Sequence, residues 1–338
     1  MKRVNVAVIG CGFIAEYVHI RDLLAIPEAK LTTICDIDQK KLSDVGAKFN
    51  VNDRCNDLGE VLKKSDVDAV LICTPTPTHA EVAIRAAEAG KHIFVEKPMS
   101  MSSSQDDMII KATEKHGVKL MVGYQMRFLP NHQKAKEIIK KGEIGDVLYA
   151  EMHSETLTIK PSEGILIDYC THFIDLLRSY FDNTRVESVA ALLHSSGGYE
   201  TETEATLILK FANGLIGRIG VFWLPNYQSW EAVDRYTKII GTKGKIFTEQ
   251  SGPAITLYKE GSLLSRIKGP HRIMPRFALN PNVPLSEMAY RRELEHFFDC
   301  ITKDKEPAVS GYDDRKALGI VEAAKESFRR GAFVEVLG

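Results

Sequence analysis

Hydrophobic positions in the first third of the chain form short runs that alternate with amphipathic stretches. Short aliphatic runs are typical of strands buried on both faces, and a period near 3.6 residues is typical of helices. We predict strands over residues 4–9, 31–35, 68–73, 92–95 and 119–122. We predict a helix that begins near Phe13 and further helices over 38–49, 57–64, 78–89 and 102–116. Repeated strand–helix–strand units predict an α/β fold with a doubly wound, parallel sheet covered on both faces.

The pattern changes after Gly123. We predict helices over 131–141, 166–181, 286–303 and 311–330, and strands over 146–156, 186–193, 204–211, 215–224, 236–240, 245–248 and 254–258. The dipeptide Asn213-Gly214 is typical of a two-residue hairpin turn, because both residues tolerate positive φ. Strands joined by short turns predict an α+β domain with a large, mostly antiparallel open sheet. We therefore predict an N-terminal Rossmann domain over 1–123 and a second domain over 124–338.

Composition narrows the classes of function. A chain of 338 residues suits two domains, and 44% hydrophobic with 26% charged residues is ordinary for a globular protein. The net charge of −1 and the lack of a basic block argue against a nucleic-acid partner. The apolar runs are too short to cross a bilayer, so we expect no membrane partner. No signal peptide precedes the first strand, and the six cysteines form no Cys-x-x-Cys pair or zinc-spaced cluster. We therefore expect reduced thiols, no metal and a cytoplasmic location.

The motif Gly10-x-Gly12-x-x-Ala15 follows the first predicted strand and opens the first predicted helix. Gly10 permits a tight turn, Gly12 lets the backbone approach a pyrophosphate, and Ala15 lets the helix and the strand pack closely. Phosphate charge would then lie at the helix N-terminus, near Phe13 and Ile14. This context predicts a dinucleotide-binding turn.

Asp36 supports that interpretation and specifies the dinucleotide. It follows the second predicted strand, 21 residues after Ala15, where a carboxylate can accept hydrogen bonds from the adenosine ribose hydroxyls. The carboxylate would repel a 2′-phosphate, and Ile37 offers no positive charge, so NAD is favoured over NADP, although Lys40 and Lys41 are near. The alternative is that Asp36 only caps the helix that begins at 38.

Two more segments end predicted parallel strands, at the edge where such sheets bind ligands. Thr74 and Pro75 begin a stiff loop, and His79 follows in the next helix. His79 is expected to face the cofactor in a structural role, or to be an ordinary residue of the first helical turn. Glu96-Lys97-Pro98 closes the next strand.

Lys97 is a candidate for proton transfer. A lysine at a crowded strand end beside a cationic nicotinamide should find its ammonium disfavoured, and it can then act as an acid or base near neutral pH. Pro98 favours an extended Lys97, which fixes the direction of the side chain. The alternative is a solvated surface lysine, the commonest state of this residue.

Asp168 and His172 form a second candidate pair in the predicted helix over 166–181. Their i, i+4 spacing places both side chains on one helical face, where a carboxylate can orient an imidazole for proton transfer. Asp175 is also within reach of His172 and competes for that role. The alternative is an ordinary helical ion pair, and the sequence does not decide between them.

Together these segments resemble the glucose-fructose oxidoreductase / inositol dehydrogenase / MocA (Gfo/Idh/MocA) family over nearly the whole chain. The segments that carry the resemblance are Gly10 to Ala15, Cys35-Asp36, Cys73-Thr74-Pro75 with His79, Glu96-Lys97-Pro98, Gly123-Tyr124-Gln125-Met126-Arg127-Phe128, Asp168 to His172, and Gly241-Thr242-Lys243-Gly244.

The resemblance implies that Lys97, Asp168 and His172 meet at an active site. His172 would be the principal acid/base, Lys97 would assist proton transfer and orient the substrate, and Asp168 would support both. Glu96 and Gln125 would join the cofactor-binding residues. The substrate would be a sugar, a cyclitol or a nucleotide-linked sugar, bound by the second domain. The outer face of its sheet would join subunits into a homodimer or homotetramer.

The chain departs from many relatives around the substrate pocket. The segment before Asp168 is short and lacks a Gly-Gly run, and Cys170 stands where a glycine is common. The identity of the substrate is therefore left open. Candidate substrate-contacting residues are Arg127, His153 and Tyr290, with Glu155, Trp223 and Asn226 as further pocket candidates by their order in the chain. Surface or core packing is at least as common for such residues.

Three functions are compatible with these observations. The first is an NAD-dependent dehydrogenase that oxidises a secondary hydroxyl of a sugar or polyol. The second is a ligand-sensing regulator of the same fold without turnover, although a sensor has no need of an acid/base set. The third is a sugar–sugar oxidoreductase that keeps its cofactor tightly bound.

Overall fold

The computed structural model describes residues 3–160, 162–225, 233–249, 252, 254–259, 270–274 and 285–337. The chain forms two compact units, Met1–Gln125 with Ser286–Lys316 and Met126–Leu285 with Ala317–Gly338. The chain first passes from one unit to the other after Gln125, and the domain division at residue 123 stays a prediction. The return of residues 286–316 to the first unit was not part of that expectation, because it depends on contacts between segments far apart in the chain.

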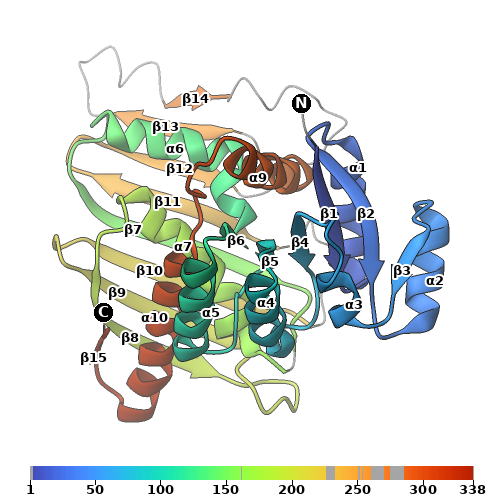
Figure 1. Ribbon diagram of the computed structural model, residues 1–338. Coiled ribbons are helices and arrows are strands. Elements are labelled where there is room, and N and C mark those ends of the chain that lie inside the picture. The colour runs from blue at the N-terminus through green and yellow to red at the C-terminus, as the bar shows by residue number, and fades with distance from the viewer. Residues whose placement is uncertain are drawn as a thin grey trace. The chain divides into compact units, whose positions relative to one another are not determined.

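The first unit is built on a six-stranded parallel sheet with the strand order β3-β2-β1-β4-β5-β6 (Figure 1). The strands are β1 (Val4–Ile9), β2 (Ala29–Cys35), β3 (Asp53–Cys55), β4 (Ala69–Ile72), β5 (His92–Glu96) and β6 (Leu120–Gly123). All four residues of β4 and of β6 are buried, as expected for strands covered on both faces. The predicted doubly wound parallel sheet is thus confirmed. The sequence prediction missed β3, a three-residue strand with one buried position.

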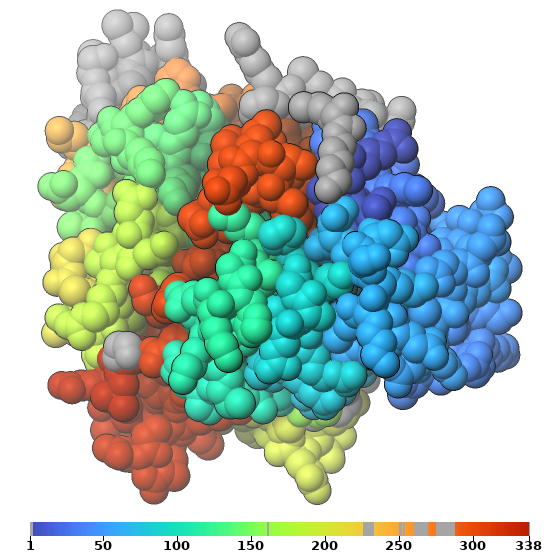
Figure 2. Space-filling view, viewed as in Figure 1, coloured from blue at the N-terminus to red at the C-terminus, as the bar shows by residue number. Residues whose placement is uncertain are grey.

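Helices connect these strands and cover the sheet. They are η1 (Ala15–His19), α1 (Ile20–Ala25), α2 (Gln39–Lys48), α3 (Leu58–Leu62), η2 (Thr76–Thr78), α4 (His79–Glu88) and α5 (Ser103–His116). Ser102 caps α5 by accepting a hydrogen bond from the N–H of Gln105, and Gly117 ends it at φ 65°. Side chains of α4 and α5, drawn in cyan to green, form a closed outer layer in the space-filling view (Figure 2).

The returning segment completes the first unit beside β5 and β6. Helix α9 (Leu285–Thr302) places Phe297 against Phe94 of β5, with ring centroids 5.8 Å apart. Beyond α9, the carbonyl of Val309 accepts a hydrogen bond from the N–H of Val122, which lies on the edge strand β6. Residues more than 180 positions away in the sequence therefore protect an otherwise open sheet edge.

The second unit contains a nine-stranded sheet with the order β14-β13-β12-β11-β7-β10-β9-β8-β15. Its strands are β7 (Val147–Thr156), β8 (Val186–His194), β9 (Glu204–Phe211), β10 (Ile216–Trp223), β11 (Arg235–Gly241), β12 (Gly244–Glu249), β13 (Ile255–Lys259), β14 (His271–Ile273) and β15 (Val334–Glu335). Only β7 and β10 pair in parallel among these strands, so the predicted mostly antiparallel sheet is confirmed. Gly214 adopts φ 84° in the predicted hairpin turn.

One face of this sheet packs against helix α7 (Thr171–Tyr180), which continues from η4 (Leu166–Cys170). A Cβ atom at Gly217 would lie 2.7 Å from the side chain of Leu177, so the face that carries Gly217 meets α7. Helices α6 (Pro130–Lys140) and α10 (Gly311–Arg330) are further helices among the described residues. None of the helices within the described residues is long and apolar enough to span a membrane.

Candidate active site

The turn after β1 has the backbone that a dinucleotide requires. Gly10 adopts φ 93°, and a Cβ atom there would lie 2.7 Å from the carbonyl oxygen of Cys73. Only glycine fits this position without strain. A Cβ atom at Gly12 would meet nothing within 4 Å, so this side of the turn is open. The helical segment then begins at Phe13 and continues through η1. The residues present therefore fit a pyrophosphate at a helix N-terminus.

Asp36 is tied directly to this turn. Its Oδ2 accepts a hydrogen bond from the N–H of Cys11 at 2.6 Å, and its Oδ1 accepts one from the N–H of Asp38 at 2.8 Å. Helix α2 is capped by Asp38 instead, whose side chain accepts from the N–H groups of Lys40 and Lys41. The alternative in which Asp36 is the helix cap is therefore wrong. Each carboxylate oxygen has a second lone pair and can still accept from a ribose hydroxyl.

Cys11, at the centre of the turn, is buried, and its thiol is not reactive. Burial and, to a smaller extent, the nearby carboxylate of Asp36 raise the pKa of Cys11 to about 12. The thiol therefore stays protonated at neutral pH and adds no negative charge where phosphate is expected.

His79 joins the two loops that end β4 and β5. Its Nδ1 lies 2.9 Å from the carbonyl oxygen of Pro98, and its Nε2 lies 2.8 Å from the carbonyl oxygen of Thr74. The ring is 1% exposed. Both ring nitrogens are thus committed to backbone carbonyls, which agrees with a structural role. The structure places Thr74, Pro75 and the Glu96-Lys97-Pro98 segment together at the carboxyl edge of the sheet.

Glu96, the last residue of β5, is buried. Lys97, which follows it, is half-buried. The Oε1 of Glu96 lies 2.5 Å from Nε2 of His19, and its Oε2 accepts a hydrogen bond from the N–H of Lys97 at 3.2 Å. The carboxylate therefore fixes the backbone that carries Lys97. His19 is a site residue that the sequence interpretation missed. Its signal was a titratable residue inside the apolar stripe of the first helix.

The structure also brings Tyr290 to this edge. Its hydroxyl accepts a hydrogen bond from Nε2 of Gln125 at 3.1 Å, and its ring meets His19 edge to face at 5.8 Å. Gln125 begins η3 (Gln125–Phe128), directly after β6. A candidate cofactor residue and a candidate substrate residue are therefore neighbours within the first unit.

Asp168 and His172 lie in the second unit, on the continuous helix formed by η4 and α7. Asp168 occupies the π-helical part, where the wider turn changes the i, i+4 geometry expected of a regular α-helix. Its Oδ1 lies 3.6 Å from Nζ of Lys160, and the residue is 7% exposed. His172 is half-buried in the first turn of α7. Short π-helical segments occur frequently at functional sites, and η1 beside the dinucleotide turn is another.

Asp175, the competing partner for His172, is bound to Arg127. The Nε of Arg127 donates to Oδ2 of Asp175 at 2.7 Å, and Nη2 of the same arginine donates to Oδ1. The carboxylate is 1% exposed, and the guanidinium side chain is 11% exposed. Arg127, expected from the sequence to contact substrate, thus forms a buried bidentate ion pair.

His153 and Glu155 lie on the sheet face opposite the one that α7 covers. His153 is paired with Gly220, which alternates with the α7-facing Gly217 along β10. Its ring stacks on Tyr236 at 5.1 Å, and its Nε2 lies 3.5 Å from Oε1 of Glu155. This placement puts His153 on the face opposite α7, the helix that carries His172, and its substrate contact stays a prediction.

The other two pocket candidates add little to the site. Nε1 of Trp223 donates to the carbonyl of Leu157 at 3.3 Å, and its ring meets Tyr199 at 5.0 Å, which is a packing role. Asn226 lies outside the described residues.

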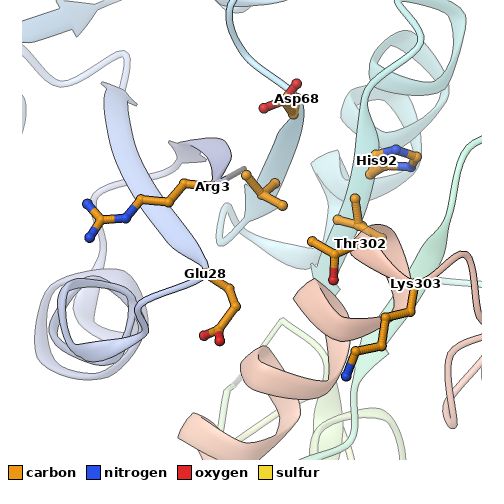
Figure 3. A pocket seen from close by; sticks show the side chains of 8 residues that line it. Arg3, Glu28, Asp68, His92, Thr302 and Lys303 are labelled. Atoms are coloured by element: carbon orange, nitrogen blue, oxygen red, sulfur yellow. The ribbon is translucent and has the colours of Figure 1, made fainter. Parts of the chain in front are cut away.

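A separate cavity of about 430 Å³ lies at the amino-terminal edge of the parallel sheet. Figure 3 shows the side chains that line it, which are Arg3, Val4, Glu28, Asp68, His92, Ile301, Thr302 and Lys303. Val4 and His92 are the first residues of β1 and β5. The dinucleotide turn and Lys97 follow the carboxyl ends of these same strands. The cavity is therefore on the wrong edge for the cofactor.

Comparison with known proteins agrees with the dinucleotide-binding geometry of the turn after β1. The family model described as "Oxidoreductase family, NAD-binding Rossmann fold" matches residues 4–124. Its companion, "Oxidoreductase family, C-terminal alpha/beta domain", matches residues 136–336. The chain belongs to the Gfo/Idh/MocA oxidoreductase family. It is accordingly an NAD-binding oxidoreductase, as the turn at Gly10 and the carboxylate of Asp36 predicted.

Relatives in this family match over almost the full length. The chain is 30% identical to myo-inositol 2-dehydrogenase of Thermotoga maritima, over 99% of this chain and 100% of the relative. It is 30% identical to scyllo-inositol 2-dehydrogenase (NAD(+)) of Bacillus subtilis, over 99% and 96% of the two chains. The crystal structure of a probable dehydrogenase from Thermotoga maritima superposes with a TM-score of 0.82 at 29% identity, over 98% and 99% of the chains.

Proposed function

We propose that this protein is a dehydrogenase that oxidises a secondary hydroxyl of a sugar or cyclitol and uses NAD as the oxidant. The observation that carries the proposal is the carboxyl edge of the first unit, where an open glycine turn, a ribose-type carboxylate and a lysine-bearing strand end occur together. The names of the two inositol dehydrogenase relatives support a cyclitol or a related polyol as the substrate class.

The cofactor would be held by residues whose geometry fits it. Gly10 and Gly12 would face the pyrophosphate, and Asp36 would accept from the ribose hydroxyls. His79 would keep the loops after β4 and β5 in register through its two carbonyl contacts. When bound, NAD takes up the hydride that leaves the carbinol carbon.

The protein's own residues would manage the hydroxyl proton. We assign His172 as the principal base, because a half-buried imidazole can accept a proton near neutral pH. Asp168 would stabilise the imidazolium that forms, and Lys97 would donate a hydrogen bond to the substrate oxygen and assist the proton transfer. Lys97 lies in the first unit and the other two in the second, so their action on one substrate is part of the proposal.

A turnover assay tests this function. Purified protein is mixed with NAD and a panel of inositols, other polyols, aldoses and nucleotide sugars, and the absorbance of NADH is followed. Lys97→Ala and His172→Ala should each lower kcat by about two to four orders of magnitude. Lys115→Ala and His116→Ala are matched controls, because both residues are exposed in the last turn of α5.

The results separate the three candidate functions. Turnover of one substrate class that is lost only in the site variants supports the dehydrogenase. Binding of NAD without turnover of any compound would favour a ligand sensor. Cofactor that remains bound through purification, with exchange of oxidation between two sugars, would favour a sugar–sugar oxidoreductase.

We also propose a homodimer or homotetramer formed through the open face of the nine-stranded sheet. Leu192, Ile216 and Tyr258 project from the face opposite α7, and they are 73%, 47% and 38% exposed. Exposed apolar residues on one sheet face support an interface between copies. Light scattering of wild type and of Leu192→Glu tests this.

The six unpaired cysteines, all buried, support a cytoplasmic location.

A further inference from the structure

One buried carboxylate lies where the chains of β5 and β6 continue past the end of their pairing. The last paired positions of these two strands are Glu96 and Gly123. Just beyond them, Met99 and Tyr124 both form hydrogen bonds to Asp314, which comes from the first turn of α10. Asp314, Met99 and Tyr124 are each 0% exposed or buried to the same degree, and all belong to the first unit.

The two oxygens of Asp314 bind different segments. Oδ2 accepts a hydrogen bond from the N–H of Met99 at 2.9 Å, and Oδ1 accepts one from the hydroxyl of Tyr124. A buried backbone N–H beyond the last ladder pair needs another acceptor, because leaving it without one costs free energy. The carboxylate of Asp314 supplies that acceptor and links the two chains where the strand pairing has ended.

The contact with Met99 holds the peptide group that directly follows Lys97-Pro98. This group consists of the carbonyl of Pro98 and the N–H of Met99. Its carbonyl oxygen lies 2.9 Å from Nδ1 of His79, and its N–H donates to Asp314. Buried side chains from α4 and α10 therefore hold one peptide plane on both sides. Because the plane is held at both ends, the backbone that leaves Lys97 has a fixed direction.

The contact with Tyr124 holds the loop after β6. The N–H of Tyr124 donates to the carbonyl of Val122 at 2.9 Å, which makes a tight three-residue turn. Gln125 follows directly, and its side chain donates to the hydroxyl of Tyr290 at 3.1 Å. Asp314 thus fixes the start of the loop that presents a candidate cofactor-binding residue.

Helix capping is the alternative role for an acidic residue in a first helical turn. In α10 the capping contact is made by Asp313, whose Oδ2 accepts from the N–H and from the hydroxyl of Ser310 at 2.9 Å each. The two hydrogen bonds of Asp314 to the loops leave the helix instead. The helix start is also close to the sheet, because a Cβ atom at Gly311 would lie 2.8 Å from the side chain of Leu120 in β6.

We propose that Asp314 is a positioning residue, which joins the two loops through one carboxylate and thereby fixes the backbone at Lys97 and at Gln125. This inference rests on the proposed function, because that function gives Lys97 and Gln125 their parts in the reaction. Asp314 is fully buried, so it acts through these two residues and not on the substrate. A small displacement of reacting groups lowers the rate steeply, which makes the position of Lys97 important.

Variants at Asp314 separate positioning from packing. Asp314→Asn keeps both contacts, because its carbonyl can accept from Met99 and its amide can donate to the hydroxyl of Tyr124. Asp314→Ala removes both contacts, and Asp314→Leu, of similar volume, takes its place if the alanine variant does not fold. Val309→Ala is the matched control for packing, since Val309 is 0% exposed and its backbone pairs with β6.

A second pair of variants tests the hydroxyl contact alone. Tyr124→Phe removes the hydrogen bond to Asp314 and leaves the contact between Asp314 and Met99 in place. Tyr312→Phe is the matched control, because the hydroxyl of Tyr312 also donates to a carboxylate, that of Glu114 at 2.7 Å, at an exposed position.

Hydrogen exchange at the amide of Met99 measures the main contact without turnover. Asp314→Ala should raise the exchange rate roughly ten- to a hundredfold, because a hydrogen bond to a charged acceptor is lost. The amide of Val8, in the buried centre of β1, corrects for changes in global stability. Asp314→Asn, Val309→Ala and Tyr124→Phe should leave the corrected rate close to that of wild type.

Steady-state kinetics and NAD binding measure the consequence. Asp314→Ala should lower kcat about ten- to a hundredfold with little change in the KM of the substrate. Asp314→Asn should recover most of that loss, and Val309→Ala and Tyr312→Phe should keep the wild-type kcat. Calorimetric titration should show weaker NAD binding in Tyr124→Phe than in Tyr312→Phe, because Gln125 is displaced in the first variant alone.

These outcomes distinguish the inference from the proposed function. If no substrate is turned over while the Met99 amide loses protection only in Asp314→Ala, the proposed function fails and the positioning of the loop stands. If the corrected exchange rate is the same in Asp314→Ala and Val309→Ala, the inference is overturned whatever the activity. Wild-type kcat in Asp314→Ala, or equal NAD affinity in Tyr124→Phe and Tyr312→Phe, would overturn the link to Lys97 or to Gln125 respectively.

Discussion

Arg127 and Asp175 form a bidentate ion pair inside the second unit, in which two guanidinium nitrogens donate to the two oxygens of one carboxylate. Both residues were candidates for other roles, one as a substrate contact and the other as the partner of His172. The pair instead joins η3 to α7. It therefore fixes the helix that presents Asp168 and His172.

Removal of either partner of this pair should be strongly destabilising. Asp175→Asn or Arg127→Ala leaves an uncompensated buried charge, which costs about 3–5 kcal/mol in the free energy of unfolding. The exposed pair between Lys141 and Glu137 is the control, and its removal should leave the free energy of unfolding nearly unchanged. Urea denaturation measures both. A loss below about 1 kcal/mol for the buried pair would show that water compensates the remaining charge.

The two glycines of the dinucleotide turn should respond differently to alanine. Gly10→Ala places a Cβ atom 2.7 Å from the carbonyl oxygen of Cys73 at φ 93°, so the folded state should lose about 1–3 kcal/mol. Gly12→Ala meets no protein atom within 4 Å, so stability should be unchanged while NAD affinity falls. Thermal denaturation and calorimetric titration with NAD measure the two effects. Unchanged NAD affinity in Gly12→Ala would contradict the pyrophosphate contact.

The two acidic residues after β2 should separate cofactor binding from helix capping. Asp36→Ala should weaken NAD binding, because it removes the ribose acceptor and the hydrogen bond that holds the N–H of Cys11. Asp38→Ala should leave NAD affinity unchanged and lower stability by about 0.5–2 kcal/mol, because Asp38 caps α2. Fluorescence titration with NADH measures the affinity. Equal loss of affinity in both variants would count against the specific role of Asp36.

Asp106 should make the stability of the first unit depend on pH. Burial and the neighbouring Asp314 raise the pKa of Asp106 to about 10. The folded protein therefore holds a proton that the unfolded chain releases above its ordinary pKa of 3.8. This contribution to stability is fully present below about pH 4 and is lost as the pH rises towards 10, by at most about 1.4 kcal/mol per pH unit.

Asp106→Asn provides the test, because an amide of similar size remains neutral throughout this pH range. Urea denaturation between about pH 5 and 9 should show that the variant gains stability relative to wild type as the pH rises. Parallel pH profiles for the two proteins would mean that Asp106 is ionised in the folded state.

The sequence by itself determined the features that depend on local pattern. Neighbouring residues in the sequence predict three of these features: the strand β1, the open glycine turn and the carboxylate of Asp36. This is possible because turn conformation and strand burial are properties of short segments. The parallel sheet followed from the order of strands and helices, because crossover connections permit few arrangements. These features also sufficed to predict the cofactor, and together with the other family segments they indicated the family.

Only the tertiary structure decided which distant residues meet. A strand pattern shows that successive side chains alternate between faces, but it does not show that α7 covers the face opposite His153. Met99 and Asp314 are 215 positions apart, and nothing in either segment alone indicates the other. Arg127 and Asp175 likewise meet through the packing of two helices. Burial and charge pairing between remote segments are set by the whole fold, and they give Glu96, Asp175 and Lys97 their surroundings.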